Sequence, residues 1–277
     1  MTVKIVTDST ADLPAQLAKE LDIIVVPVYV RFGNTLYRDG VDISTEEFYE
    51  RQSSSSVFPF TTAPSAGEFA RTYEQLSSIT NEVVSIHVTR KHSTTYDAAL
   101  LGMKLAEKTG YRIEVMDSEG VSMWLGLVVL AAARAAKAGY QLHQVVETIQ
   151  KTVQQIRALA LLDTVKYIVK GGRLVGAFTR IEAVLNVKGL LTLRNGQIRP
   201  AGLVRSRRKG IERLGEFIRS APVIEELAIV YSTTPEDAEK LADDIAPALP
   251  NVVPIIVRLG PALGVHAGPG ALIVVTR

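Results

Sequence analysis

The sequence predicts an α/β fold with two domains. In the first half, short apolar, β-branched segments alternate with longer amphipathic segments, which is the pattern of a mainly parallel sheet flanked by helices. In the second half, Asn195-Gly196 separates two β-rich runs and predicts antiparallel pairing, hence an α/β domain with a mixed or antiparallel sheet. A chain of 277 residues that is 47% hydrophobic can form two cores. We place the domains at 1–157 and 158–277.

The first domain is expected to open as a β-α-β unit. Strands are predicted at 3–6 and 23–30, and a helix at 12–21 carries Pro14 in its first turn. Residues 52–56, a glutamine and four serines, are expected to form a loop. Capping boxes or apolar periodicity predict further helices at 44–51, 65–78, 93–108, 122–138 and 142–156, and strands at 83–88 and 112–116.

The second domain is expected to begin with a strand at 159–162 and a helix at 164–169 that stops at Gly171-Gly172. A hairpin of 189–194 and 197–200 follows. The basic run 205–209 leads into a helix that ends at 218. The remaining elements are predicted at 227–231 (strand), 235–245 (helix), 252–257 (strand) and 271–275 (strand).

Composition excludes several classes of function. The net charge of +2 argues against a protein that binds nucleic acid through many phosphate contacts. The chain has no cysteine, and none of its four histidines has ligand spacing to another, so we expect no metal and no cofactor. The longest uncharged apolar stretch, 121–133, is too short to cross a bilayer, and no signal peptide is apparent. We therefore expect a cytoplasmic protein that makes at most transient contact with a membrane.

Hydroxyl-rich segments follow the predicted strands of the first half. They are Thr7–Thr10, Thr61–Ser65, His92–Thr95 and Asp117–Ser122. In an open α/β sheet the carboxyl ends of the strands face one crevice, so these segments are expected to meet at a single rim. Hydroxyls and the free amides of helix N-termini bind anions, which predicts a site for a carboxylate or a phosphate.

The same segments belong to a set of motifs in which the chain resembles the DegV family of bacterial fatty-acid-binding proteins. The motifs run in order along the chain: Lys4–Pro14, Thr61–Ser65, Asp117-Ser118 with Ser122, Met123 and Gly126, Lys170–Arg173, Val204–Arg207 and Gly264–Gly270. Each motif alone is weak evidence, whereas six in order are specific. One departure is that Ser93-Thr94-Thr95 stands where the family has Ser-Gly-Thr, and Lys91-His92 before it also differ from the family pattern.

The resemblance implies a carrier without catalysis of its own, with a lipid site between its two domains. A long-chain fatty acid such as palmitate would lie in a buried tunnel. A separate ATP-dependent fatty acid kinase would phosphorylate its carboxylate to an acyl phosphate for phospholipid synthesis. Carried across by motif, the head group would be held by Thr61, Thr62 and Ser93, with Thr94 and His266 close by. Arg173 and Arg205 are the candidates for a surface that faces the kinase.

Other interpretations of these residues stay open. Ser65 and Thr10 are expected to be helix caps, and Gly171-Gly172 to be a helix stop, because no P-loop lysine follows them. A stand-alone hydrolase or phosphotransferase could use Ser93, His266 and either Asp8 or Asp117 on a small acyl or phosphorylated substrate. The sequence lacks the Gly-x-Ser-x-Gly turn of an α/β hydrolase, which weighs against that alternative. A third interpretation of the chain is a DNA-binding regulator that would contact DNA through the basic run 205–209.

Overall fold

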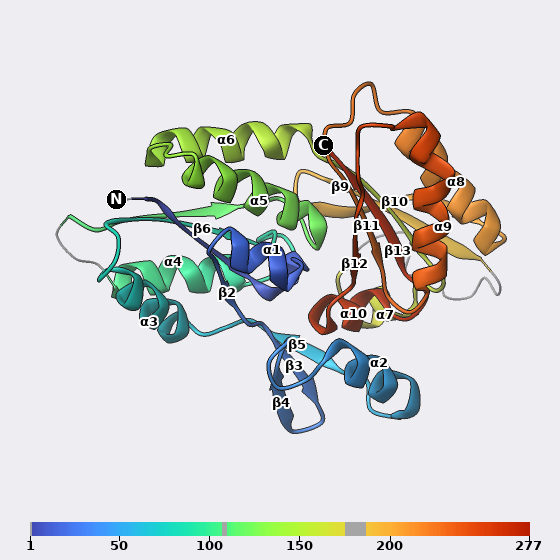
Figure 1. Cartoon of the computed structure of the whole chain (residues 1–277). Helices are drawn as coiled ribbons and strands as arrows, with labels where there is room; N and C mark the ends of the chain where they lie inside the picture. Colours follow the sequence, from blue (N-terminus) through green and yellow to red (C-terminus); the bar gives the residue numbers. More distant parts are fainter. Residues whose placement is uncertain (1, 107–109, 175–186) are drawn as a thin grey trace.

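In the computed structural model, which describes residues 2–106, 110–174 and 187–277, three sheets organise the chain (Figure 1). Four parallel strands form the first sheet, in the order β2 (Ile23–Val26), β1 (Lys4–Asp8), β6 (Glu82–His87) and β7 (Arg112–Asp117). Helices α3 (Ala66–Leu76) and α4 (Thr95–Leu105) cover one face. The other face packs against α1 (Ala15–Glu20), α5 (Met123–Lys137) and α6 (Leu142–Gln155). The predicted parallel sheet flanked by helices is confirmed.

The second sheet has six strands and is mixed. Its order is β10 (Gln197–Val204), β9 (Lys188–Arg194), β8 (Arg157–Leu162), β13 (Leu272–Thr276), β11 (Leu227–Tyr231) and β12 (Ile255–Arg258), and only β11 and β12 pair in parallel. Helices α8 (Arg207–Arg219) and α9 (Pro235–Ile245) cover one face of it. Asn195 and Gly196 both have positive φ, as the predicted hairpin turn requires.

A small antiparallel sheet was not predicted. It consists of β4 (Thr35–Arg38), β3 (Tyr29–Phe32) and β5 (Phe60–Thr62), and α2 (Thr45–Ser54) packs beside it. The prediction of one strand over 23–30 is wrong, because the chain leaves the first sheet at Pro27, which has no amide hydrogen to donate, and enters this sheet at Tyr29. The predicted loop at 52–56 is also partly wrong, since α2 continues through Ser54.

Two short helices lie where the three sheets meet, α7 (Lys166–Lys170) and α10 (Pro261–Ala267). Helix α10 was not predicted. Gly264 allows α10 to pack closely on α2, where an added Cβ would lie 2.6 Å from the Phe48 ring. The N-terminus of α10 is capped from far away in the sequence: the amide of Gly260 donates to Asp12 Oδ1 at 3.0 Å. Asp12 has a φ of 50°, so the helix expected from residue 12 starts only at Ala15.

Asp39 is buried and its neighbour Asp12 is partly buried beneath α10, and burial is the largest cause of their raised pKa values. The pKa of Asp12 rises to about 8 and that of Asp39 to about 7. Ser122 Oγ donates to Asp12 at 2.6 Å, and Ser9 Oγ donates to Asp39 at 2.8 Å. Residues of the predicted hydroxyl-rich segments therefore position the helix that carries His266.

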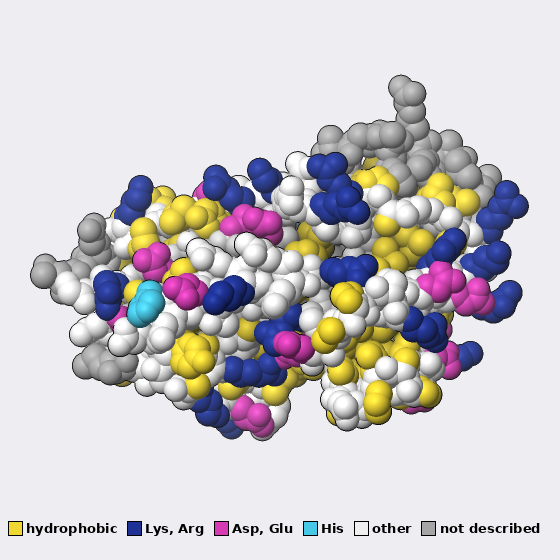
Figure 2. Space-filling model, turned by 90° about the horizontal axis from the view of Figure 1, so that it is seen from above, with side chains coloured by type: hydrophobic (Ala, Val, Ile, Leu, Met, Phe, Trp, Pro, Cys, Tyr) yellow, Lys and Arg dark blue, Asp and Glu magenta, His cyan; other side chains and the backbone are white. Residues whose placement is uncertain are grey.

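Figure 2 shows basic and acidic side chains interspersed over one face, without a continuous basic surface. None of the helices within the described ranges combines the length and the apolar character that a bilayer span requires.

Candidate functional site

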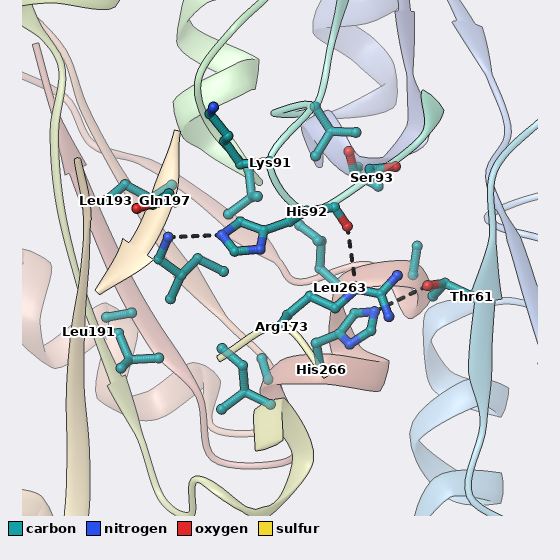
Figure 3. A pocket seen from close by; sticks show the side chains of 18 of the residues that line it. Thr61, Lys91, His92, Ser93, Arg173, Leu191, Leu193, Gln197, Leu263 and His266 are labelled. Carbon is teal, nitrogen blue, oxygen red and sulfur yellow. Dashed lines mark hydrogen bonds between the residues drawn. The ribbon is translucent and has the colours of Figure 1, made fainter. Parts of the chain in front are cut away.

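A cavity of about 950 Å³ lies between the inner face of the second sheet and the loops at the carboxyl ends of β1 and β6 (Figure 3). Its floor is built from alternate residues of three strands of the second sheet. In β8, Leu159 and Leu161 point toward α8 and α9, so Ala158, Ala160 and Leu162 face the opposite way. The apolar floor consists of Ala158, Ala160, Leu162, Leu191, Leu193, Ile273 and Val275.

The cavity is polar at one end. Thr61 and Thr62 come from β5, Ser93 and Thr94 from the turn before α4, and His266 from α10, and all five line the cavity. Arg173, after α7, lines it as well. Segments that are 205 residues apart in the sequence thus converge, which places every residue predicted for the head group in the wall of one cavity.

Thr61 and His266 are directly bonded. Thr61 Oγ1 lies 3.1 Å from His266 Nε2 (Figure 3). His266 Nδ1 is buried without a hydrogen-bond partner and lies against the Cα of Gly171, where an added Cβ would be 2.3 Å away. A bare nitrogen fits against a Cα better than an N–H without an acceptor would, which favours the tautomer protonated at Nε2. In that tautomer Nε2–H donates to Thr61, and the Thr61 hydroxyl hydrogen stays available for a ligand.

His266 carries no charge in this setting. Burial, with smaller contributions from Arg173 and His92, lowers the pKa of His266 to about 3. The imidazole is therefore neutral at physiological pH, and it orients a hydroxyl rather than neutralising an anion.

Arg173 is the cation at this end of the cavity. It is partly buried, which lowers its pKa, and its NH1 and Nε donate to the carbonyl oxygens of Gly171 at 2.7 Å and His92 at 3.3 Å. Within the described ranges no carboxylate pairs with it. Figure 3 shows its guanidinium beside His266 and near Thr61, so a ligand carboxylate there would gain a charged donor.

Ser93 forms a local turn at the start of α4. Its Oγ accepts from the Thr95 amide at 3.2 Å and lies 2.9 Å from Thr95 Oγ1. Thr94, the N-cap residue, makes no side-chain capping bond and is exposed. Ser93 and Thr94 thus line the cavity where α4 begins.

Arg205 lies outside this cavity. It is exposed in the turn between β10 and α8 and makes no ion pair within the described ranges. Its neighbour Arg207, in contrast, is held by Asp163 and Asp237 at 2.7 and 2.6 Å and has a structural role.

The structure does not assemble the proposed nucleophile set. His266 Nε2 bonds to Thr61 rather than Ser93, and Asp117 accepts from the backbone amides of Glu119 and Arg90. Asp8 instead bonds to His87 Nδ1 at 3.0 Å, and Ser85 Oγ lies 2.7 Å from His87 Nε2. That arrangement resembles a catalytic triad, but all three side chains are fully buried and none lines the cavity. It is a satisfied polar network of the core.

The floor of the cavity and the contribution of His92 to its wall were not predicted from the sequence. The alternation in β8 was visible, but the sequence did not show which face meets a cavity. His92 lines the cavity, and its Nε2 accepts the amide hydrogen of Ile198 at 2.9 Å. No local pattern signals a bond between residues 106 apart.

These features define an α/β protein whose partly open cavity has an apolar floor and hydroxyl, imidazole and guanidinium groups at one end. Comparison with known proteins agrees with that class. The family model described as "Uncharacterised protein, DegV family" matches residues 2–276. A DegV domain-containing protein of Caldanaerobacter subterraneus is 33% identical over 97% of this chain and 96% of its own. One from Streptomyces coelicolor is 35% identical over 99% and 97%. The chain belongs to the DegV family.

Solved structures extend this likeness to the fold. A DegV family protein from Thermus thermophilus, described by its fatty acid binding, superposes with a TM-score of 0.92 at 28% identity and covers 100% of this chain and 99% of its own. DegV of Bacillus subtilis, described as a fatty acid binding protein, gives 0.91 at 28% identity with the same coverage. A stearic acid-binding protein from Eubacterium ventriosum gives 0.89 at 25% identity, covering 99% and 98%.

Proposed function

We propose that this protein binds a long-chain fatty acid in the cavity and presents the carboxylate to a separate ATP-dependent kinase. The observation that carries the proposal is the cavity itself, whose apolar floor ends at a neutral His266, an oriented Thr61 and Arg173, which pairs with no carboxylate in the described part of the chain. Burial of an acyl chain contributes about 0.8 kcal/mol per methylene, so about 14 methylenes give about 11 kcal/mol before ordering costs. The fatty acid binding described for the structural relatives supports the same ligand.

The carboxylate would lie among Thr61, Ser93 and Arg173. Each hydrogen bond to a charged group contributes about 1.5 to 3 kcal/mol, which offsets the desolvation of the anion. Thr62 and Thr94, both exposed, would border the head group from the solvent side. In the kinase reaction a carboxylate oxygen bonds to the γ-phosphorus of ATP and ADP departs, giving an acyl phosphate and ADP. No proton need move, because the bound acid is ionised.

The partner kinase would supply all of the catalysis, and the carrier would act in the cytoplasm ahead of phospholipid synthesis. We assign Arg205 to the face that meets the kinase, since it is exposed and lies outside the cavity. Arg173 would bind the carboxylate head group. Because the kinase acts on that carboxylate, Arg173 would also lie next to the active site of the kinase.

Reversal of charge at these two arginines is expected to separate the two roles. Arg205→Glu should keep fatty acid affinity and lower acyl phosphate formation by the kinase at least about tenfold, because an interface charge is reversed. Arg173→Glu should lose fatty acid binding itself, because a carboxylate would face a carboxylate. Binding is measured by calorimetry and acyl phosphate by hydroxylamine trapping.

Arg71→Glu, at an exposed position on α3, is the matched control and should leave both quantities unchanged. If the kinase forms acyl phosphate at the wild-type rate with Arg205→Glu, Arg205 does not contribute to the surface that contacts the kinase. Normal fatty acid affinity in Arg173→Glu would contradict the place given to the head group.

A further inference from the structure

The β9–β10 hairpin closes one side of the cavity by contact with the loop that carries Ser93. Gln197 and Ile198 on β10 and Lys91 and His92 on the loop all line the cavity. Because β10 is an edge strand of the described sheet, its outward amides have no strand to pair with. One of them, the amide of Ile198, donates to His92 Nε2 at 2.9 Å (Figure 3).

A second bond joins the same two segments at the tip of the hairpin. Thr89 Oγ1 donates to the carbonyl oxygen of Gly196 at 2.9 Å. Gly196 has a φ of 74°, and an added Cβ would lie 2.5 Å from Thr89 Oγ1, so the hairpin tip and the loop are in close contact. The bond from Thr89 does not depend on pH, whereas the bond to His92 does.

We propose that His92 is a pH-sensitive clamp that holds the β9–β10 hairpin closed over the cavity. Only the neutral imidazole with a bare Nε2 can accept the Ile198 amide. A proton on Nε2 would place N–H against N–H and remove the bond outright. It would also add a positive charge beside Arg173, whose Nε donates to the carbonyl of His92. Protonation of His92 therefore destabilises the closed position of the hairpin in two ways.

Arg173 is the charged neighbour that contributes to the lowered pKa of His92. Arg173 faces it from the segment after α7, and His266 lies beyond on α10. The remaining charges nearby are Arg90 and Lys91 on its own loop, Arg199 on β10, Asp97 on α4 and Glu119 near the hairpin tip. Within the described ranges no carboxylate bonds to His92.

The direction of the pH effect follows from these neighbours. Burial first, and Arg173 second, lower the pKa of His92 below its ordinary 6.5 in the closed form. The open form therefore binds the proton more tightly. As pH falls through about 6.5, the closed form loses stability relative to the open form. If the clamp controls access to the fatty acid site, that role rests on the proposed function. The opening of the hairpin itself can be measured without any ligand.

The test is amide hydrogen exchange at Ile198 in the ligand-free protein, corrected for the intrinsic rate at each pH. For the loss of one hydrogen bond we expect the protection factor to fall about tenfold between about pH 7.5 and pH 5. His92→Gln offers a carbonyl acceptor that does not titrate, so the protection factor of the Ile198 amide should stay high and should not change with pH. His92→Leu should be poorly protected at every pH. His143→Gln, at an exposed position on α6, should keep the wild-type profile.

A flat wild-type profile, or the same fall in His92→Gln, would overturn the proposal. A second readout is the release rate of a fluorescent long-chain fatty acid, which should rise over the same pH range in wild type and not in His92→Gln. If the protein binds no fatty acid, the proposed function fails while the exchange result still decides the clamp.

Discussion

A Thr61→Ala/Ser93→Ala double variant is expected to bind long-chain fatty acid at least about 100-fold more weakly than the wild type. Two hydrogen bonds to an ionised group contribute about 3 to 6 kcal/mol together, and the desolvated carboxylate would have no replacement for them. His266 would in addition lose its partner at Nε2, which now lies 3.1 Å from Thr61. Displacement of a fluorescent fatty acid measures the affinity.

The matched control is Ser53→Ala/Thr148→Ala. Both hydroxyls bond to carbonyl oxygens of their own helices and neither lines the cavity, so affinity should be unchanged. Thermal unfolding of each variant shows whether the fold is retained. Wild-type affinity in a folded Thr61→Ala/Ser93→Ala variant would place the head group elsewhere.

Ala160→Phe is expected to weaken the binding of long chains for a different reason. Ala160 lies on β8 with its side chain in the cavity floor, and a benzyl group there would occupy the space of about four methylenes. At about 0.8 kcal/mol per methylene this lowers affinity by about 3 kcal/mol, or about 100-fold. Shorter acids should lose less. A titration series over chain length therefore measures how far the tail reaches.

Ala138→Phe adds the same group at an exposed position after α5 and serves as the control for Ala160→Phe. Equal losses for short and long acids in Ala160→Phe would show that the variant disturbs the head group or the fold. Unchanged binding of long acids would mean that the tail does not cross β8.

The elements set by local chemistry could be predicted from the sequence. The capping boxes of Ser44 with Glu47 and Ser65 with Glu68 are both formed, because their partners lie within one helical turn. Asn195-Gly196 forms the predicted turn, since positive φ is a property of those two residues. The small sheet and α10 could not be predicted. Their formation depends on contacts such as that of Gly260 with Asp12, 248 residues away.

The same distinction holds for the site. The resemblance predicted Thr61, Ser93 and His266 for the head group, and all three line one cavity. Arg173 was expected on an outer face, and its position beside His266 depends on how α7 and α10 pack, which the sequence does not reveal. The role of His92 depends on a bond to the β10 edge, formed only once both sheets are in place.

The most direct test of the fatty acid carrier is denaturing extraction of the purified protein, followed by mass spectrometry of the released lipid. We expect about one long-chain fatty acid per chain in the wild type and little or none in the Ala160→Phe and Thr61→Ala/Ser93→Ala variants. A wild-type protein that releases no fatty acid, and that takes none up when one is added, would contradict the proposal that the cavity binds a fatty acid.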